Sequence, residues 1–457
     1  MYCTTGFRAP FRPLSAPKTS LGPQDNPRQE RIIGDRQDQR SVRAPGRGVP
    51  RCGFVQAQLR GDRRSEGEKA GMAKDGSPGG SRRHELDWIR ILVTLNLVPF
   101  HAAWLITGVE GFSRVERETP GWIALEVFVG FTSPLHMVLL FLVAGVGACH
   151  SLRRRSPGEF LHERVRRLLV PLITFMLFLF PLLGWYWPAA GELEGVAFFT
   201  EFWPWCLATT LCSPVTHGPN WAHMWFVGYL FLYSLLLLPL RPRQGGAAAG
   251  RVTEFLARRP GAVFLPALPF ALAFALLAPC FHFYQNNLYT DWGYFAYNLT
   301  AFLMGFLIAR DRPFLDACNR HFGAALLLGL FLSTGKLALQ AWFPAWSEPA
   351  FNGCYQLYAL GAGLNTWAWV MVALVLARRL LSFSNRFLEH FNRISYPYYI
   401  LHLVVLVVAG HHLTRLGLGV GAEFLLLCLV TWPVTWLLAV LAGGTAATRF
   451  LFGIKGP

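Results

Sequence analysis

Apolar runs of membrane length recur along this chain, and they constrain its fold more than any other feature. A run of ~20 apolar residues can cross the hydrocarbon core of a bilayer as one helix. Because 53% of the 457 residues are hydrophobic, a soluble enzyme is excluded. We expect an all-α polytopic membrane protein with about ten transmembrane helices, near 89–109, 122–148, 168–188, 221–240, 261–281, 292–309, 322–343, 354–377, 394–410 and 420–442.

Arginine is distributed unevenly among the loops between these runs. One alternate set of loops is arginine-rich, at 153–167, 241–259, 310–320, 378–393 and 449–455, whereas the other set contains only Arg114, Arg117 and Arg415. Cytoplasmic loops carry the excess of Lys and Arg, so we expect an even number of spans with both termini in the cytoplasm. The aromatic-rich run 196–212 is expected to be external and interfacial or re-entrant, because a full crossing there would reverse this bias.

The first 83 residues differ in composition from the rest of the chain. They are rich in Arg, Gly, Pro, Ser and Gln and show no helical or strand periodicity. We expect residues 1–83 to be a disordered basic cytoplasmic arm, with Met72 as an alternative start, ahead of a membrane domain at 84–457. The net charge of +16 lies in this arm and in the loops, a pattern that serves membrane orientation and argues against nucleic acid as a partner. Nine cysteines without ligand spacing predict no metal site.

The first apolar run carries an arginine at its start and a histidine near its middle. Arg90 and His101 are eleven positions apart, which is about three helical turns, so their side chains share one face and are separated by ~16 Å along the axis. Asp87 precedes Arg90 by one turn. Ionisable residues inside hydrocarbon are costly and are functional candidates by default. The alternative is that His101 bonds a neighbouring helix and Arg90 marks the cytoplasmic border.

Two further groups extend this candidate site. His136 lies about as far from the cytoplasmic end of the second run as His101 lies from the start of the first, so an antiparallel hairpin would let the two imidazoles meet. Arg164 and Arg167 lie one turn apart on an expected interfacial helix, where two guanidiniums suit a phosphate-rich ligand. The alternatives are an interhelical hydrogen bond for His136 and purely topogenic charge for the arginines.

Two more histidines are candidates at opposite levels. His223, flanked by Trp221 and Trp225, is expected at the external surface, where it would line an acceptor cleft or belong to an aromatic belt. His402 is expected about two turns above the inner surface, as a structural residue or as a contact for a donor. Other ionisable or amide side chains within the apolar runs need partners that the sequence does not identify, namely Glu126, Lys336, Asn365 and Glu423.

The joint order of four segments resembles the membrane acyltransferases of acyltransferase family 3, and within it the glucans biosynthesis protein C branch. The segments are ELDWIR with ten residues to the histidine of VPFHAAW, HMVLLFLVAGV before ERVRRLLVP, HMWFVGYLF, and ISYPYYILH. The resemblance covers about 84–442. One departure is that Val143 and Ala144 stand where the family often has a residue followed by serine before Gly145, which leaves the subfamily and the substrate open.

The resemblance implies a ten-helix enzyme that moves an acyl group from cytoplasmic acyl-CoA, such as acetyl-CoA or succinyl-CoA, to a hydroxyl, often of an envelope or periplasmic sugar. It also implies a bacterial inner membrane. No tightly bound cofactor is expected. By the same resemblance His101 is catalytic, whereas Arg90, Arg164 and Arg167 serve the donor.

These residues suggest a mechanism and leave two rival interpretations. His101 is expected to act as general base toward the acceptor hydroxyl, with the arginines clamping the CoA phosphates; a covalent acyl-histidine stays open. His136 is expected to orient His101 or to bind the oxyanion. One rival is a transporter or lipid-handling protein that uses His101, His136, Glu126 and Lys336 as a proton or substrate path. The other is an inactive relative that serves as a membrane partner.

Overall fold

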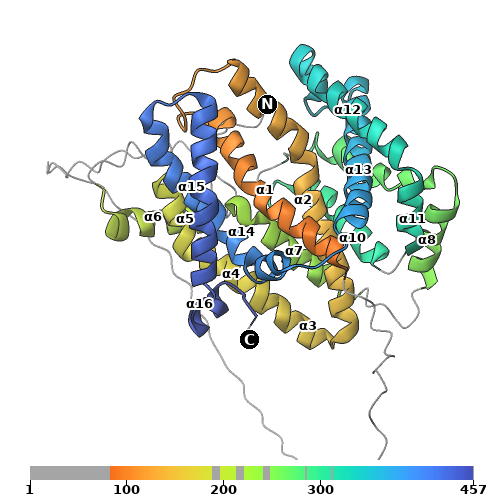
Figure 1. The fold of residues 1–457 in the computed structure, drawn as a ribbon, viewed down its shortest axis with the longest axis horizontal. Helices are drawn as coiled ribbons and strands as arrows, with labels where there is room; N and C mark the ends of the chain where they lie inside the picture. Colours follow the sequence, from red (N-terminus) through yellow and green to blue (C-terminus); the bar gives the residue numbers. More distant parts are fainter. Residues whose placement is uncertain are drawn as a thin grey trace, which may run out of the picture. The chain divides into compact units, whose positions relative to one another are not determined.

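The computed structural model describes residues 83–187, 196–212, 221–239, 247–281, 283, 286–309 and 312–455. The basic arm predicted for 1–83 and the alternative start at Met72 therefore lie outside the described residues, apart from residue 83. All secondary structure in the described ranges is helical, without a strand, as the apolar runs predicted (Figure 1).

Seven helices or continuous helix groups of the described residues are long and apolar enough to cross a membrane. They are α1 (His84–Gly108), α2 (Pro120–Arg154), the group α3–α5 (Pro157–Trp185), α12 (Phe322–Trp342), α13 (Gly353–Leu380), α14 (Arg386–Leu413) extended by a 3-10 turn to Leu416, and α15 (Val420–Leu441).

Three further apolar segments of the described chain are shorter or bent. They are Ala222–Leu236, which contains α7 (Trp225–Leu236), Ala262–Leu277, which contains α9 (Ala267–Leu272), and α10 (Trp292–Ile308), which meets the next helix α11 (Arg312–Arg320) at 116°. Each of the ten predicted spans thus contains helix, and the number that cross stays a prediction.

Two long helices run parallel, and this restricts the topology. Arg90 on α1 bonds Asn392 on α14, and His101 contacts His402, at sequence separations of 302 and 301 residues. If only the seven long helices crossed, α14 would be the sixth crossing and would run antiparallel to α1. If all seven of these helices cross, an odd number of the three shorter segments must cross as well, and the total would then be even, which is the parity expected from the arginine bias.

The third membrane helix group is interrupted by two π-helical segments. α3 (Pro157–Arg164) starts at a capping box made by Ser156 and Glu159. It is followed by η1 (Val165–Leu169), α4 (Val170–Thr174), η2 (Phe175–Leu179) and α5 (Phe180–Trp185). Short π segments inside helices are frequent at functional sites.

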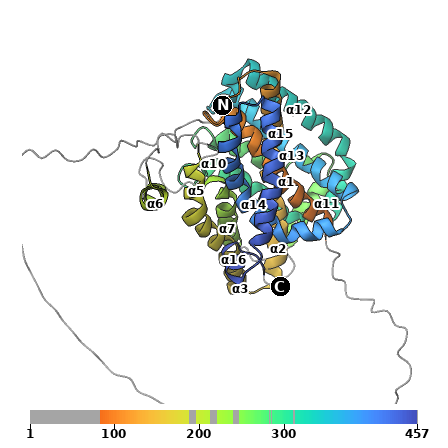
Figure 2. The same ribbon diagram turned by 60° about the vertical axis from the view of Figure 1, so that its left-hand side comes forward.

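Indole groups take up carbonyls that prolines leave free. Pro181 cannot donate to the Leu177 carbonyl, which instead accepts from Trp203 Nε1 at 2.9 Å. In α1, Pro99 leaves the Leu95 carbonyl free, and Trp432 Nε1 of α15 donates to it at 3.2 Å. These bonds satisfy backbone oxygens where lipid offers no partner. Trp203 begins α6 (Trp203–Cys212), which follows η4 (Phe198–Phe202) in the run predicted as re-entrant. α6 lies at the side of the helical unit (Figure 2).

A close crossing joins α2 to α10. A Cβ atom at Gly145 would overlap the Phe302 carbonyl, and one at Gly305 would overlap the Leu142 carbonyl. Glycine at both positions therefore lets the two backbones meet, as small residues commonly do in membrane interfaces.

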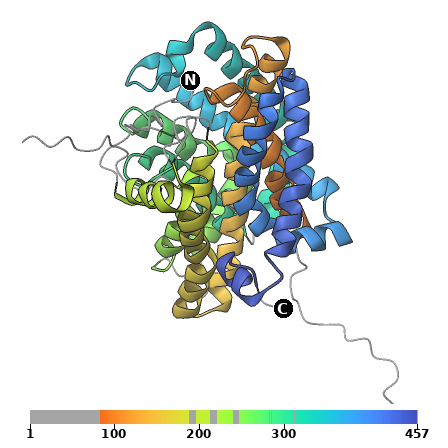
Figure 3. The ribbon, with the colours of Figure 1, turned by 90° about the vertical axis from the view of Figure 1, so that its left-hand side faces the viewer.

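Several smaller helices complete the described unit. They are α8 (Ala247–Arg258), the 3-10 turn Pro344–Ser347, and α16 (Ala446–Leu451). α3 and α16 lie at one end of the unit, and the loop between α1 and α2 lies at the other (Figure 3).

Candidate functional site

His101 of α1 lies against His402 of α14 at the centre of the parallel helix pair. Nδ1 of His101 is 3.3 Å from Nε2 of His402, and the ring centroids are 5.1 Å apart. His402 is fully buried, whereas His101 keeps part of its surface accessible. The two imidazoles form one polar unit inside an apolar core.

The hydrogen bonds fix which ring nitrogens carry protons. Nδ1 of His402 is 2.6 Å from the Tyr399 carbonyl, and Nδ1 of His101 is 2.9 Å from the Leu97 carbonyl. A carbonyl only accepts, so both Nδ1 atoms donate. Nε2 of neutral His402 is then an acceptor for the His101 N–H, which it shares with the Leu97 carbonyl. Nε2 of His101 has no hydrogen-bond partner in the described ranges, and its lone pair is available to take a proton.

His223 belongs to the same group, which corrects its expected place at the external surface. Its side chain is only 7% exposed, and its ring lies 5.1 Å from that of His402. Nε2 donates to the Ile400 carbonyl at 3.1 Å, and Tyr399 donates its hydroxyl to the His223 carbonyl. Phe175 of η2 packs edge-on against the imidazole at 5.0 Å. His223 therefore packs behind His402, away from an open surface.

Trp225 is also buried, so it does not line an open cleft. It is 8% exposed and packs against Phe141, Tyr229 and Tyr294. Its place is the contact between α7, α2 and α10.

His136 does not reach His101 directly. The Phe100 ring packs on His136 with a centroid separation of 4.2 Å and lies 5.2 Å from His101. His136 is buried, and its Nδ1 donates to the Thr132 carbonyl of its own helix at 3.0 Å. The hairpin α1–α2 forms as expected, but the imidazole that meets His101 comes from α14.

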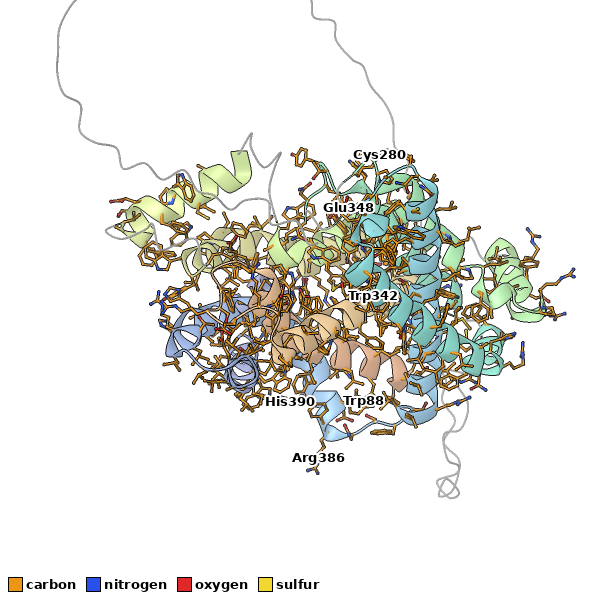
Figure 4. All side chains as sticks on the ribbon, turned by 90° about the horizontal axis from the view of Figure 1, so that it is seen from above. Trp88, Cys280, Trp342, Glu348, Arg386 and His390 are labelled. Atoms are coloured by element: carbon orange, nitrogen blue, oxygen red, sulfur yellow. The ribbon has the colours of Figure 1, made fainter. Side chains whose placement is uncertain are left out.

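Asp87 and Asn392 hold Arg90 at the start of α1. Its guanidinium forms an ion pair with Asp87 at 2.9 Å and donates to Asn392 Oδ1 of α14. Trp88 stacks on Phe387, and Arg386 and His390 mark the same end of α14 (Figure 4). The predicted shared face of Arg90 and His101 is therefore the face that α14 covers.

Arg164 and Arg167 lie where α3 passes into η1, beside a half-buried carboxylate. Glu163 pairs with Arg155 at 3.1 Å and with Arg167 at 3.5 Å, and Ser151 donates to it at 3.0 Å. Arg164 stacks on the Phe160 ring at 4.7 Å. Its Nε atom is buried, and among the described residues it has no hydrogen-bond partner. The single carboxylate of Glu163 thus lies among three arginines. The Nε–H of Arg164 is left without an acceptor in the described ranges.

The arginine group also reaches α14. Arg167 interacts electrostatically with Tyr396, and a Cβ at Gly453 would touch both residues. The Tyr396 hydroxyl is buried without a partner in the described part of the chain. Sequence inspection missed Asn392 and Tyr396. Their one sequence signal is the helical spacing of four from Asn392 to Tyr396, which brings these two residues to one side of α14.

The helix groups α1, α3–α5 and α14 therefore run in the same direction. Their side chains meet at three successive heights along the helix axes, which we call levels. At the first level α1 contributes Arg90, α3–η1 contributes Arg167, and α14 contributes Asn392 and Tyr396. The second level holds His101, His402 and, through His223, Phe175.

The third level is aromatic. Trp104 lies one turn beyond His101, Trp187 follows α5, and Tyr186 contacts His411 at the end of α14. The axial separation from Arg90 to His101 is ~16 Å.

The residues of the rival transport path are not joined. Glu126 is exposed on α2, and Lys336 lies on α12. Within the described ranges no hydrogen bond or ion pair links either of them to His101 or His136. The described residues also contain no group of three or more His, Cys, Asp or Glu side chains arranged to hold a metal ion.

Comparison with known proteins gives one match that covers most of the chain. A family model described as an acyltransferase domain, of acyltransferase family 3, matches residues 83–441. No curated protein and no solved structure matches the chain.

Proposed function

Because the chain belongs to acyltransferase family 3, as its motifs predicted, and is a membrane acyltransferase, we propose that it transfers an acyl group from acyl-CoA to a hydroxyl of a glycan. The observation that carries this proposal is the alignment of arginines, histidines and aromatic rings along three parallel helix groups. The CoA phosphates bind at the arginine level, and the acceptor approaches from the aromatic level.

In the proposed reaction His101 acts as general base through Nε2. Nε2 takes the proton of the acceptor hydroxyl while the oxygen attacks the thioester carbonyl carbon. When the tetrahedral intermediate collapses, the carbon–sulfur bond breaks and the proton passes from Nε2 to the leaving thiolate. The products are the ester and free CoA thiol. In the covalent alternative, Nε2 attacks the thioester carbonyl carbon and the carbon–sulfur bond breaks, which releases CoA thiolate. The acceptor hydroxyl then attacks the acyl-histidine, the carbon–nitrogen bond breaks, and the hydroxyl proton goes to the thiolate.

His402 is a positioning residue in this scheme, in place of the donor contact expected from the sequence. Its Nε2 accepts the Nδ1–H of His101 at 3.3 Å. That bond selects the tautomer with a free Nε2 and stabilises the imidazolium once it forms, because a charge-assisted hydrogen bond is stronger than a neutral one. His136 is not given the orienting role in this scheme, because its Nδ1 bonds the Thr132 carbonyl and Phe100 packs against both imidazoles.

The donor is proposed to bind where α1, α3–η1 and α14 meet. Guanidiniums bind phosphate oxygens in pairs, and the unused Nε of Arg164 supports an anion at this level. The distance of ~16 Å from Arg90 to His101 lets the long thiol arm of CoA run along α1 and present its thioester to Nε2.

We also propose the details that the family resemblance implies. They are the glucans biosynthesis protein C branch, acetyl-CoA or succinyl-CoA as donor, a bacterial inner membrane with both termini cytoplasmic, and ten spans. The proposed partners are the bilayer, acyl-CoA and a glycan. The even parity of spans derived from the parallel α1 and α14 supports this topology.

The test is thiol release from acyl-CoA by the purified protein. We expect release from acetyl-CoA or succinyl-CoA that requires a glycan acceptor and that is absent with His101→Gln. Movement of solute across sealed vesicles without any acyl-CoA consumption would support the transporter instead.

A further inference from the structure

The sequence analysis gave no role to the residues of the aromatic level. It predicted an acceptor site at His223 and Trp225 instead. Five partly or fully accessible side chains form it, from three helix ends that are far apart in sequence. They are Trp104 of α1, Tyr186 and Trp187 after α5, and His411 and His412 of α14.

The rings form two contacting groups, and the first of them begins at His101. Trp104 lies edge-on to His101 at 6.3 Å, and Trp187 lies 6.5 Å from Trp104. Tyr186 packs at 5.3 Å from His411 and 6.0 Å from His412. Gly108 leaves room for the indole, because a Cβ there would lie 3.2 Å from Trp104 Nε1. Because Tyr186 and Trp187 are adjacent in the chain, the two groups together lead from His101 to the helix ends that lie opposite the arginines.

The polar edges of these rings are available to a ligand. In the described ranges no hydrogen bond is made by the indole nitrogens of Trp104 and Trp187, by the Tyr186 hydroxyl, or by the ring nitrogens of His411 and His412. In contrast, Trp88, Trp367 and Trp432 each donate to a backbone carbonyl. A site that combines aromatic faces with unused donors and acceptors suits a molecule with flat apolar faces and hydroxyl edges.

An interfacial aromatic belt explains this arrangement less well. Belt tryptophans lie at headgroup level on the outside of a membrane protein. Trp342 at the end of α12 fits that description, since it is 76% exposed (Figure 4). Trp104 and Trp187 are half-buried, face each other from two helix groups, and adjoin His101.

We propose that Trp104, Tyr186, Trp187, His411 and His412 form the acceptor subsite, and that its ligand is a sugar ring. This inference rests on the proposed acyltransferase function. The C–H face of the sugar packs on the indoles of Trp104 and Trp187, while Tyr186 and the two histidines bond its hydroxyl groups. One hydroxyl of the bound sugar then points at Nε2 of His101, at the opposite side from the donor.

The experiment measures steady-state kinetics with acyl-CoA and a linear glucose oligosaccharide as the acceptor probe. The variants are Trp187→Leu, Trp187→Phe and His411→Ala, with Trp342→Leu as the control for loss of an indole at a membrane surface. We expect Trp187→Leu to raise the KM for the oligosaccharide about tenfold, the cost of one lost stacking contact. Trp187→Phe should restore most of the affinity, His411→Ala should raise the same KM, and the KM for acyl-CoA should stay as in the wild type.

Two results would overturn the inference while the proposed function stands. One is a wild-type acceptor KM in Trp187→Leu. The other is a wild-type acceptor KM in His411→Ala. If the wild type released no thiol with any acceptor, or released it only with a phospholipid or protein hydroxyl, the proposed function itself would fail, and the acceptor subsite with it. If Trp187→Leu does not accumulate in the membrane, the KM of His411→Ala for the oligosaccharide, compared with that of the wild type, tests the inference instead.

Discussion

At the scale of single residues, the account depends on which nitrogen of His101 is free. Both Nδ1 atoms of the His101–His402 pair donate to backbone carbonyls three or four residues earlier, so each helix sets the tautomer of its own histidine. The helix thus positions the base, and the second histidine adds a buried acceptor. This arrangement suits a membrane, where every polar backbone atom needs a hydrogen-bond partner within the protein.

His101→Gln should lower kcat by about 10²–10⁴-fold, the usual contribution of general base catalysis, with little change in either KM. Glutamine keeps a polar side chain near the Leu97 carbonyl but has no basic nitrogen. The measurement is acceptor-dependent thiol release by protein that elutes like the wild type from size-exclusion chromatography. Wild-type turnover would remove His101 from the chemistry.

His402→Phe should lower kcat by about 10- to 100-fold, the equivalent of one hydrogen bond to a charged group, and should leave both KM values near those of the wild type. His136→Phe is the matched control, since His136 is also buried but bonds only its own helix. We expect a smaller effect from it. A greater loss of kcat in His136→Phe than in His402→Phe would return the orienting role to His136.

Arg164→Gln should raise the KM for acyl-CoA about tenfold, because it removes the guanidinium whose Nε is unused. The neighbouring exposed Arg154 supplies the control as Arg154→Gln. The KM of the acceptor should not change in either variant. Equal effects of the two substitutions would assign Arg164 to topology alone.

At the scale of helices, the sequence predicted which residues share a face of one helix better than it predicted which helices pack together. The spacing of Arg90 and His101 correctly predicted one shared face, because that face is a property of a single helix. The partner of His101 depends instead on the register between α1 and α14, which no local pattern specifies. For that reason His136 was favoured, and His223 was placed at the surface although it packs behind His402.

The π segments are a second feature that local reasoning did not anticipate. Arg164 ends α3 and Arg167 lies within η1, so the two arginines are not related by the regular turn that the sequence predicted. Pro171 follows this segment and cannot donate to the Arg167 carbonyl, which accounts for local unwinding of the regular ladder.

The α2–α10 crossing makes a prediction about stability. Gly145→Ala should destabilise the protein by about 1–3 kcal/mol, the typical cost of overpacking, because a Cβ there would overlap the Phe302 carbonyl. Gly147→Ala on the same helix is the control, since a Cβ there has no neighbour within 4 Å. Thermal unfolding in detergent should show a lower Tm for Gly145→Ala alone. An unchanged Tm would show that the two backbones do not approach this closely.

At the scale of the whole molecule, α1, α3–α5 and α14 run in parallel, and in the proposed function they link one side of the membrane to the other. Parallel neighbours in a bundle require an even number of crossings between their starts, and the arginine bias gives the same parity. The apolar runs could therefore predict the all-helical class of fold, whereas the number of spans and their orientation stay predictions. They could not predict the site, because its three levels arise only when α1, α3–α5 and α14 come together.

The topology can be checked by labelling single cysteines introduced into a cysteine-free variant. Ser156 precedes α3 and Ser384 precedes α14. We expect the cysteines of Ser156→Cys and Ser384→Cys to be modified from the same side of the membrane. Glu118→Cys and Gly417→Cys, in the loops at the other helix ends, should react from the opposite side. Labelling of Ser156→Cys and Ser384→Cys from different sides would contradict the parallel packing of the two helix groups.

The most direct test of the central claim is a transfer assay in sealed proteoliposomes. The acceptor oligosaccharide is enclosed in the vesicles and labelled acyl-CoA is added outside. The account predicts that acylated oligosaccharide accumulates inside, that none forms when both substrates are outside, and that His101→Gln vesicles form none in either case. Product that appears when both substrates are on the same side, with none across the membrane, would contradict a site that joins a donor end to an acceptor end.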